Sequence, residues 1–174
     1  MDKVSPLNPP ENLVNRIIIL VFRMAEVLRD SFDDLDDIKM KSISMDFEKG
    51  LISAFKSTFE NVKITGCDFY WKKCLRENIR SQGLLPLHDT DEEFHKLVRT
   101  MWALSYIPID DLVTVYQTHV LDVVIENLNN NLVWAEYSDE IKSFITYFNR
   151  TWIGDVNPRT KSRGRPMFAY DLWN

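Results

Sequence analysis

The spacing of apolar residues predicts a helix near the start of the chain, followed by a break. Between Leu13 and Leu28 they recur at intervals of three and four, so we expect a helix to about Phe32 with one wide face buried. The acidic segment 33–37 then predicts a polar break. Residues 1–12 contain several prolines and are expected to form a flexible, extended lead-in. The apolar positions of the helix are Leu13, Ile17, Leu20, Val21, Met24 and Leu28.

A strand–helix–strand–helix unit is predicted next. Residues 39–45 and 62–65 alternate in hydrophobicity with the period of a strand. Residues 47–59 and 68–82 carry apolar residues four apart, which predicts an amphipathic helix after each strand. A helix that connects two neighbouring strands implies that they are parallel. Because two strands alone do not make a stable sheet, either the helices cover them closely or a longer chain supplies further strands. The helical stripes are Phe47, Leu51, Phe55 and Phe59, then Trp71, Leu75 and Ile79.

The second half of the chain has the periodicity of helices and no strand signal. Thr90-Asp-Glu-Glu93 matches a capping box, and the helix that it opens is expected to end before Pro108. A second helix is expected to stop at the asparagines 129–131, and a third near Gly154. The fold class is therefore predicted to be α/β and mostly helical, with about two parallel strands followed by an all-α region.

Composition and charge narrow the functional classes. Hydrophobic residues make up 45% and charged residues 27% of the 174, which predicts one packed domain. A net charge of -5 excludes a globally basic nucleic-acid binder. The charge is uneven, however, because residues 26–37 are rich in acids while the predicted loop 155–167 is basic. That loop favours either a local DNA contact or a plain solvated surface, and the apolar segment after it, 168–173, is expected to pack back. The basic residues of the loop 155–167 are Arg159, Lys161, Arg163 and Arg165.

The cysteines and histidines suggest no metal centre of their own. The spacing of Cys67 and Cys74 fits no zinc motif, and we expect buried thiols in a reducing compartment. The histidines are scattered and form no triad with a nucleophile. The longest apolar run, 17–22, is too short to span a membrane, so the protein is expected to be soluble and intracellular, with no membrane partner.

Several short motifs, taken in order, resemble the transposase domain of Mutator-like elements. The motifs are Asp46-Phe-Glu-Lys, Gly66-Cys-x-Phe69, Tyr147-Phe148, Thr151-Trp-Ile-Gly154 and Leu172-Trp-Asn174. The likeness covers residues 13–174 and implies a ribonuclease-H-like fold interrupted by a helical insertion. Residues 13–85 would then be a partial core, 86–154 the insertion, and 155–174 the basic loop with the C-terminal apolar segment.

The resemblance also implies a chemistry. Members of the family cut and join DNA with two divalent ions, Mg²⁺ or Mn²⁺, held by Asp, Asp and Glu, because such ions steady the attacking and leaving oxygens of a phosphodiester. Asp46 matches the second carboxylate. In the family the first lies upstream of the matched helix and the third downstream of the last motif, so we expect this chain to be catalytically incomplete and to hold no cofactor alone. Cys67 matches the family's Cys-x-x-His, but Tyr70 stands where His is expected.

Alternatives remain at each candidate site. Asp46 is either a metal ligand or the N-cap of a helix that opens at Phe47. Arg163-Gly-Arg-Pro166 is either a minor-groove hook or a surface loop. The aromatic stripe of 47–59, together with Trp71, is expected to be core rather than a base-stacking platform. The leading prediction is a transposase-derived, DNA-binding fragment in the nucleus. The alternatives are part of an active metal-dependent transposase, or a helical protein-interaction module that could self-associate.

Overall fold

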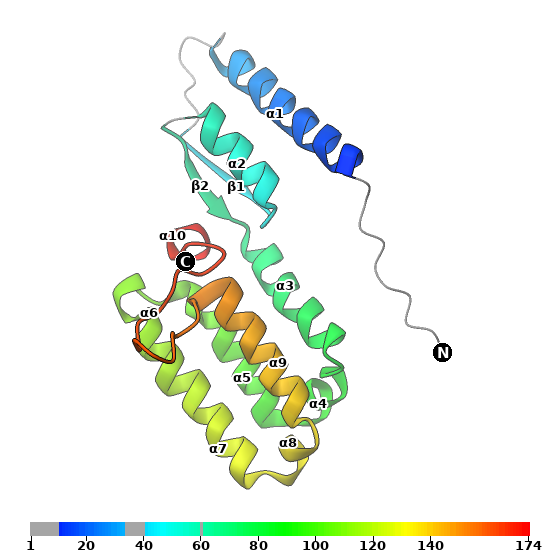
Figure 1. Ribbon diagram of the computed structural model, residues 1–174, viewed down its shortest axis with the longest axis vertical. Helices are drawn as coiled ribbons and strands as arrows, with labels where there is room; N and C mark the ends of the chain where they lie inside the picture. The colour runs from blue at the N-terminus through cyan, green and yellow to red at the C-terminus, as the bar shows by residue number, and fades with distance from the viewer. Residues whose placement is uncertain (1–10, 34–40, 60) are drawn as a thin grey trace. The chain divides into compact units, whose positions relative to one another are not determined.

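The described residues are mostly helical and include one small parallel sheet of two strands, as the sequence predicts (Figure 1). The structure is a computed structural model that describes residues 11–33, 41–59 and 61–174. It divides into two compact units, Met1–Thr65 and Gly66–Asn174. Of the predicted segments, the lead-in 1–12 and the polar break 33–37 lie almost wholly outside the described residues.

The described part of the first unit contains two helices and the sheet. Helix α1 (Glu11–Asp33) is followed by strand β1 (Ser42–Met45), helix α2 (Lys49–Thr58) and strand β2 (Lys63–Gly66). The Lys63 amide donates to the Lys41 carbonyl over 3.0 Å, which joins the two strands at the start of the ladder. The strand–helix–strand crossover is the expected connection for parallel strands, so this part of the prediction is confirmed.

The packing face of α1 differs from the prediction. Ala25 is fully buried, and α1 packs against α2. Leu20 and Met24, which were expected on the buried face, are 64% and 47% exposed. Apolar residues lie around most of the described circumference of this helix, so periodicity alone does not select the face that packs. Among the residues of α1 whose burial is described, Ala25 is the buried one.

Helix α2 begins later than expected, and Asp46 is not its N-cap. Glu48 occupies the cap position, and its carboxylate accepts from the Gly50 amide over 3.3 Å. Phe47 therefore precedes the helix instead of opening it. The predicted stripe is confirmed as core at Phe55 and Phe59, which are buried and stack with ring centroids 5.4 Å apart, whereas Phe47 and Leu51 are half-buried.

The second unit consists mainly of helices, and a non-helical segment, 154–169, contains one antiparallel bridge. Two of its short helices, α4 and α8, escaped prediction because five or six residues cannot display a helical period. Two wider π-type turns extend α6 and α9. The elements are α3 (Asp68–Ser81), α4 (Leu85–Thr90), α5 (Glu92–Ala103), α6 (Ile109–Tyr116), α7 (Asp122–Asn130), α8 (Leu132–Glu136), α9 (Ser138–Phe148) and α10 (Tyr170–Trp173).

The core of the second unit is built on three tryptophans. Trp71 of α3 is 1% exposed, and its ring centroid lies 4.5 Å from that of Trp152 and 4.6 Å from that of Trp173. Leu75 and Ile79 continue the buried stripe of α3, as the spacing predicts. The expected return of the C-terminal segment is also confirmed, because Trp173 is buried in this cluster.

The cap of α5 is one residue further along than the capping-box motif indicates. Asp91, not Thr90, accepts from the Phe94 amide over 2.8 Å, and the same oxygen accepts from Nε1 of Trp134 over 3.0 Å. The Thr90 hydroxyl instead donates to the Pro86 carbonyl within α4. The unpredicted helix α4 thus holds Thr90, which leaves the capping position to the next acceptor in the chain.

The predicted helix after Pro108 is interrupted by a π-type turn, Gln117–Leu121, and its buried row changes accordingly. The buried residues recur every four positions. In an α-helix of 3.6 residues per turn such positions would move gradually around the helix, and the wider π-type turn offsets this rotation. His119, within the π-type turn, is exposed. The buried residues are Leu112, Tyr116, Val120 and Val124. Across the described residues, every helix is too short or too polar to cross a membrane.

Candidate nucleic-acid interface

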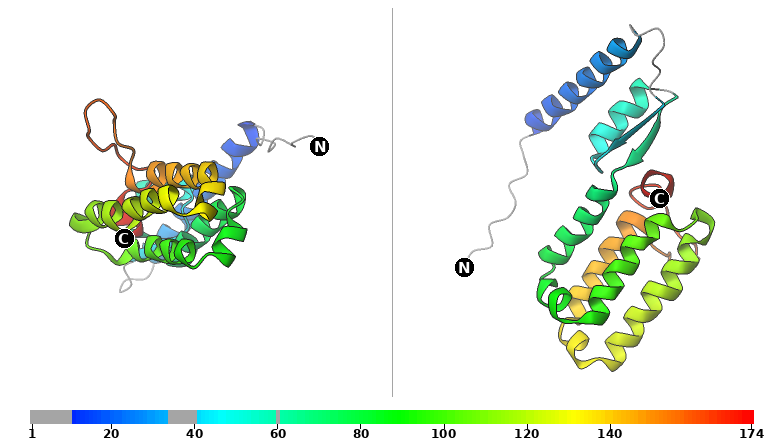
Figure 2. Two further views of the ribbon diagram at one scale, coloured as in Figure 1. Left: turned by 90° about the horizontal axis from the view of Figure 1, so that it is seen from below. Right: turned by 180° about the vertical axis from the view of Figure 1, so that it is seen from behind.

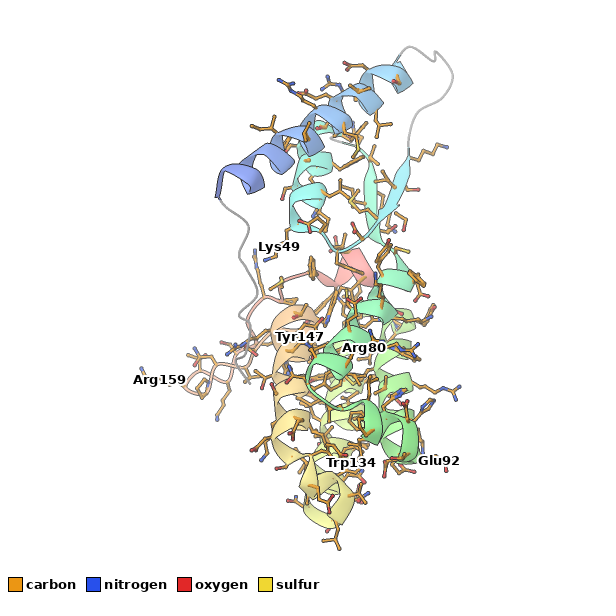
Figure 3. The ribbon with its side chains drawn as sticks, turned by 90° about the vertical axis from the view of Figure 1, so that its right-hand side faces the viewer. Lys49, Arg80, Glu92, Trp134, Tyr147 and Arg159 are labelled. Atoms are coloured by element: carbon orange, nitrogen blue, oxygen red, sulfur yellow. The ribbon has the colours of Figure 1, made fainter. Side chains whose placement is uncertain are left out.

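The predicted basic loop is an ordered hairpin. We name residues 155–165 the basic hairpin. Its arms are joined by an antiparallel bridge between Val156 and Arg163, and the Gly164 amide donates to the Asp155 carbonyl over 2.8 Å. Figure 2 (left) shows the hairpin extending beyond the helices of its unit, and Figure 3 shows Arg159 at its outer end. The basic residues of this segment therefore all lie on one projecting hairpin.

The tip of the basic hairpin is fixed by turn chemistry. Oδ1 of Asn157 accepts from the Arg159 amide over 2.9 Å and from the Thr160 amide over 3.2 Å, which is the Asx arrangement that stabilises tight turns. The Asn157 carbonyl accepts from the Lys161 amide over 2.9 Å, and Lys161 has a φ of 57°. These bonds hold the backbone while the side chains of Arg159 and Lys161 remain exposed.

The base of the basic hairpin closes on Gly154. This residue is buried with φ 94° and ψ 137°, a backbone region essentially restricted to glycine. A Cβ atom at this position would lie 2.0 Å from the Gly164 carbonyl oxygen. Nη1 of Arg163 donates to the Gly154 carbonyl over 2.6 Å. The two arms therefore approach each other as closely as the backbone allows.

Arg163 has a different role from the other cations of the hairpin. The hook interpretation requires two guanidinium groups pointing outward, but Arg163 is half-buried and bonded to the hairpin base. Arg165 is exposed, as are Arg159 and Lys161. Beside the base lies an open cleft of about 750 Å³, where Arg150 pairs with Asp155 over 3.4 Å. The outward-facing charge is carried by Arg159, Lys161 and Arg165.

Three tyrosines of this unit have raised pKa values, which do not suit them to proton transfer near neutral pH. Burial raises the pKa of Tyr116, and the positive charge of Arg163 opposes part of the rise. Burial raises the pKa of Tyr147 to about 12. Burial also raises the pKa of Tyr170, whose hydroxyl donates to the Ile153 carbonyl over 2.6 Å. These phenols remain neutral and act as packing and hydrogen-bonding groups.

Asp46 lies directly after β1, at the carboxyl end of the strand. Its Oδ1 atom is buried and has no hydrogen-bond partner among the described residues. A buried, unsatisfied carboxylate oxygen is costly, and such an atom is satisfied by a water or a cation. The residues described by the structure contain no group of three His, Cys, Asp or Glu side chains placed to hold a metal.

The remaining family-motif residues lie on α3. Cys67 is half-buried at the N-cap position of α3, and neither it nor the half-buried Cys74 is in a disulfide. Tyr70 is exposed in the first turn, with Nζ of Lys73 5.4 Å from its ring centroid. The prediction of buried thiols therefore holds only in part.

Sequence reasoning missed two features of these sites. The hairpin was expected only as a loop, although Asn157-Pro158 and the glycine at 154 are turn signals that could have indicated it. The histidines were expected to be scattered, yet the rings of His88 and His95 lie 4.7 Å apart. No protein-family model, curated protein or solved structure matches this chain.

Proposed function

We propose that this chain binds DNA through the basic hairpin and derives from a transposase of the Mutator-like kind. The observation that carries the binding proposal is the exposure of Arg159, Lys161 and Arg165 on one ordered, projecting element. Within the described residues their side chains have no ion-pair or hydrogen-bond partner. No acidic residue lies between 156 and 165, so nothing within that segment neutralises the charge.

Phosphate contact is the chemistry that such an element supports. A lysine or arginine that neutralises a DNA phosphate releases a condensed counterion, so the logarithm of affinity falls by about 0.9 per contact for each tenfold rise in salt. Contacts by Arg159, Lys161 and Arg165 would give a slope of roughly -2 to -3. An exposed hairpin arm can also enter a narrow minor groove, where the potential is most negative. Binding of this kind is weak and depends little on sequence.

The test is fluorescence anisotropy of a labelled duplex, titrated with the full chain at several salt concentrations. The variant R159Q/K161Q/R165Q is expected to lose most of the duplex affinity and to flatten the salt slope. The matched control removes as many positive charges from exposed positions elsewhere in the same unit, and it is expected to retain binding. Equal losses in variant and control, or no duplex affinity in the unmodified chain, would refute the proposal. The control substitutions are K96Q, R99Q and K142Q.

The relation to the ribonuclease-H-like fold is part of the same proposal. The parallel order of β1 and β2 around the crossover helix α2 is compatible with a segment of such a core. The family likeness gives the reason to propose it, and with it a nuclear location.

A second candidate function is metal-dependent DNA cleavage involving Asp46. The unsatisfied Oδ1 of Asp46 at the end of β1 favours it, because Mg²⁺ and Mn²⁺ prefer carboxylate oxygens. By resemblance, two further carboxylates would come from parts of the family that residues 13–174 do not match. We expect Mn²⁺ to broaden the NMR signals around Asp46, and Asp46→Asn to abolish both this effect and any cleavage. Cleavage that persists in the variant would exclude the role.

A further inference from the structure

One face of α3 carries a row of cations beside a groove. Lys72, Arg76 and Arg80 are spaced four residues apart, which places them in one row along the helix. Together with Trp102 of α5 they line a groove of about 490 Å³. Figure 3 labels Arg80 toward the end of this row. The groove lies within the second unit, and the basic hairpin contributes nothing to its lining.

The charge of this groove is neutralised only in part by the protein, because Glu77 also lies in its lining. Arg80 and Arg76 are exposed and have no ion-pair or hydrogen-bond partner among the described side chains. Lys72 pairs with Asp68 over 2.7 Å, and Lys73 is 3.8 Å from Glu77. Exposed pairs of this kind contribute little and exchange readily for other anions. In a chain with a net charge of -5, the groove is a local excess of positive charge that favours an anionic ligand.

Exposed aromatic rings accompany the cations. Phe69, which lines the groove in the first turn of α3, is 68% exposed. Tyr106 is 71% exposed, and its hydroxyl donates to Asp68 over 3.2 Å. Its ring centroid lies 6.0 Å from Nζ of Lys72. Large exposed rings interleaved with cations favour a ligand that has both negative charges and flat faces.

The spacing of the cations indicates a repeating anion. Four residues of an α-helix rise about 6 Å, so Lys72, Arg76 and Arg80 span about 12 Å in even steps. Successive phosphates of an extended polynucleotide have a similar separation. In a duplex the bases are stacked on each other and present no face to Phe69, whereas an unpaired strand does.

We propose that this groove binds single-stranded nucleic acid. Backbone phosphates lie along Lys72, Arg76 and Arg80, and a base stacks on Phe69. The inference goes beyond the proposed duplex contact of the basic hairpin and does not depend on it, because the two sites share no residue. DNA and RNA strands share the recognised chemistry.

The test measures anisotropy of a labelled thymidine 12-mer, with the full chain and the variant R76Q/R80Q. Removal of the two exposed guanidinium groups is expected to weaken binding at least tenfold at low salt and to reduce the salt slope by about 1.4, at about 0.7 per contact. Phe69→Leu is expected to weaken binding at least about fivefold with an unchanged salt slope, since stacking is not ionic. The control K96Q/R99Q removes two exposed charges from α5 and should retain binding.

Further binding experiments identify the ligand. A uridine 12-mer that binds more tightly than the thymidine strand would identify RNA as the preferred form, and the reverse would identify DNA. Competition by poly-glutamate as strong as that by the strand would show an acidic-protein site and overturn the inference. Unchanged binding of the single-stranded 12-mer by R76Q/R80Q would also overturn the inference, provided that the circular dichroism and melting of the variant match those of the unmodified chain. A chain that binds duplex through the hairpin but no single strand leaves the first proposal standing and refutes this one.

Discussion

The sharpest structural prediction concerns Gly154 at the base of the basic hairpin. In Gly154→Ala the new Cβ would lie 2.0 Å from the Gly164 carbonyl oxygen, with φ at 94°. An L-residue with positive φ costs roughly 1–2 kcal/mol. Relief of the clash separates the arms, which breaks the bonds from Gly164 to Asp155 and from Arg163 to Gly154, at about 1 kcal/mol each. These costs sum to about 3–4 kcal/mol in the free energy of unfolding, before the entropic gain from restricting the unfolded chain is subtracted.

Gly83 provides the matched control. Its φ is 78°, but nothing lies within 4 Å of the position that a Cβ would take. Gly83→Ala therefore carries the backbone strain without the clash, and both variants share the same entropic gain from restricting the unfolded chain, about 0.4–1 kcal/mol. Equilibrium urea unfolding, followed by tryptophan fluorescence, is expected to place Gly154→Ala about 2 kcal/mol below Gly83→Ala.

Duplex affinity adds an independent readout of the same substitution. Opening the hairpin base displaces the exposed cations, so Gly154→Ala should weaken duplex binding while Gly83→Ala leaves it unchanged. If the two variants lose equal stability, the close approach of Gly154 and Gly164 does not exist in solution. The description of the hairpin as a clamped element would then be wrong.

Two further predictions follow from buried polar groups. Asp91→Ala removes the oxygen that accepts from both the Phe94 amide and Nε1 of Trp134, so we expect the free energy of unfolding in urea to fall by about 1–3 kcal/mol. Asp91→Asn keeps an acceptor and should cost less than half as much. Equal losses in the two variants would refute the double role of Asp91. The pKa of Tyr147 rises to about 12 in the folded chain, above the ordinary value of about 10, so the folded state holds its proton longer and stability falls as pH rises through this interval. Tyr147→Phe should make that alkaline loss shallower in thermal melts at graded pH, and an unchanged pH dependence would contradict the assignment.

Features that follow from the helical spacing of apolar residues could be predicted from the sequence. Features that depend on a single neighbouring residue or helix could not. The stripe of Trp71, Leu75 and Ile79 was predictable, because beyond its first three residues the large apolar side chains of α3 recur every four positions. The face of α1 was not, because apolar residues surround most of its described part, and among them Ala25 is the buried one. The cap at Asp91 depended on α4, a helix too short to be seen in the pattern.

At the candidate sites, too, exposure could be predicted from the sequence while individual contacts could not. Exposure of Arg159, Lys161 and Arg165 follows from composition, since basic residues beside prolines and glycine favour a surface loop. The inward bond of Arg163 depends on the conformation of Gly154, which no residue pattern encodes. The groove on α3 is not evident from the sequence, because cations four residues apart are typical of the solvated face of any amphipathic helix. Only the position of Trp102 on α5 indicates that this face is hollow.

The tryptophan cluster has a spectroscopic consequence. Trp71 and Trp173 lie nearly parallel, with an interplanar angle of 20° and centroids 4.6 Å apart, while Trp152 meets Trp71 edge-on at 85°. Indole transitions at such separations couple, and coupled chromophores in a fixed chiral arrangement give a paired positive and negative band in circular dichroism. Since Trp173 belongs to the C-terminal segment and Trp71 to α3, that band is an intrinsic optical signal of whether the segment is docked. The chain carries this reporter without a label.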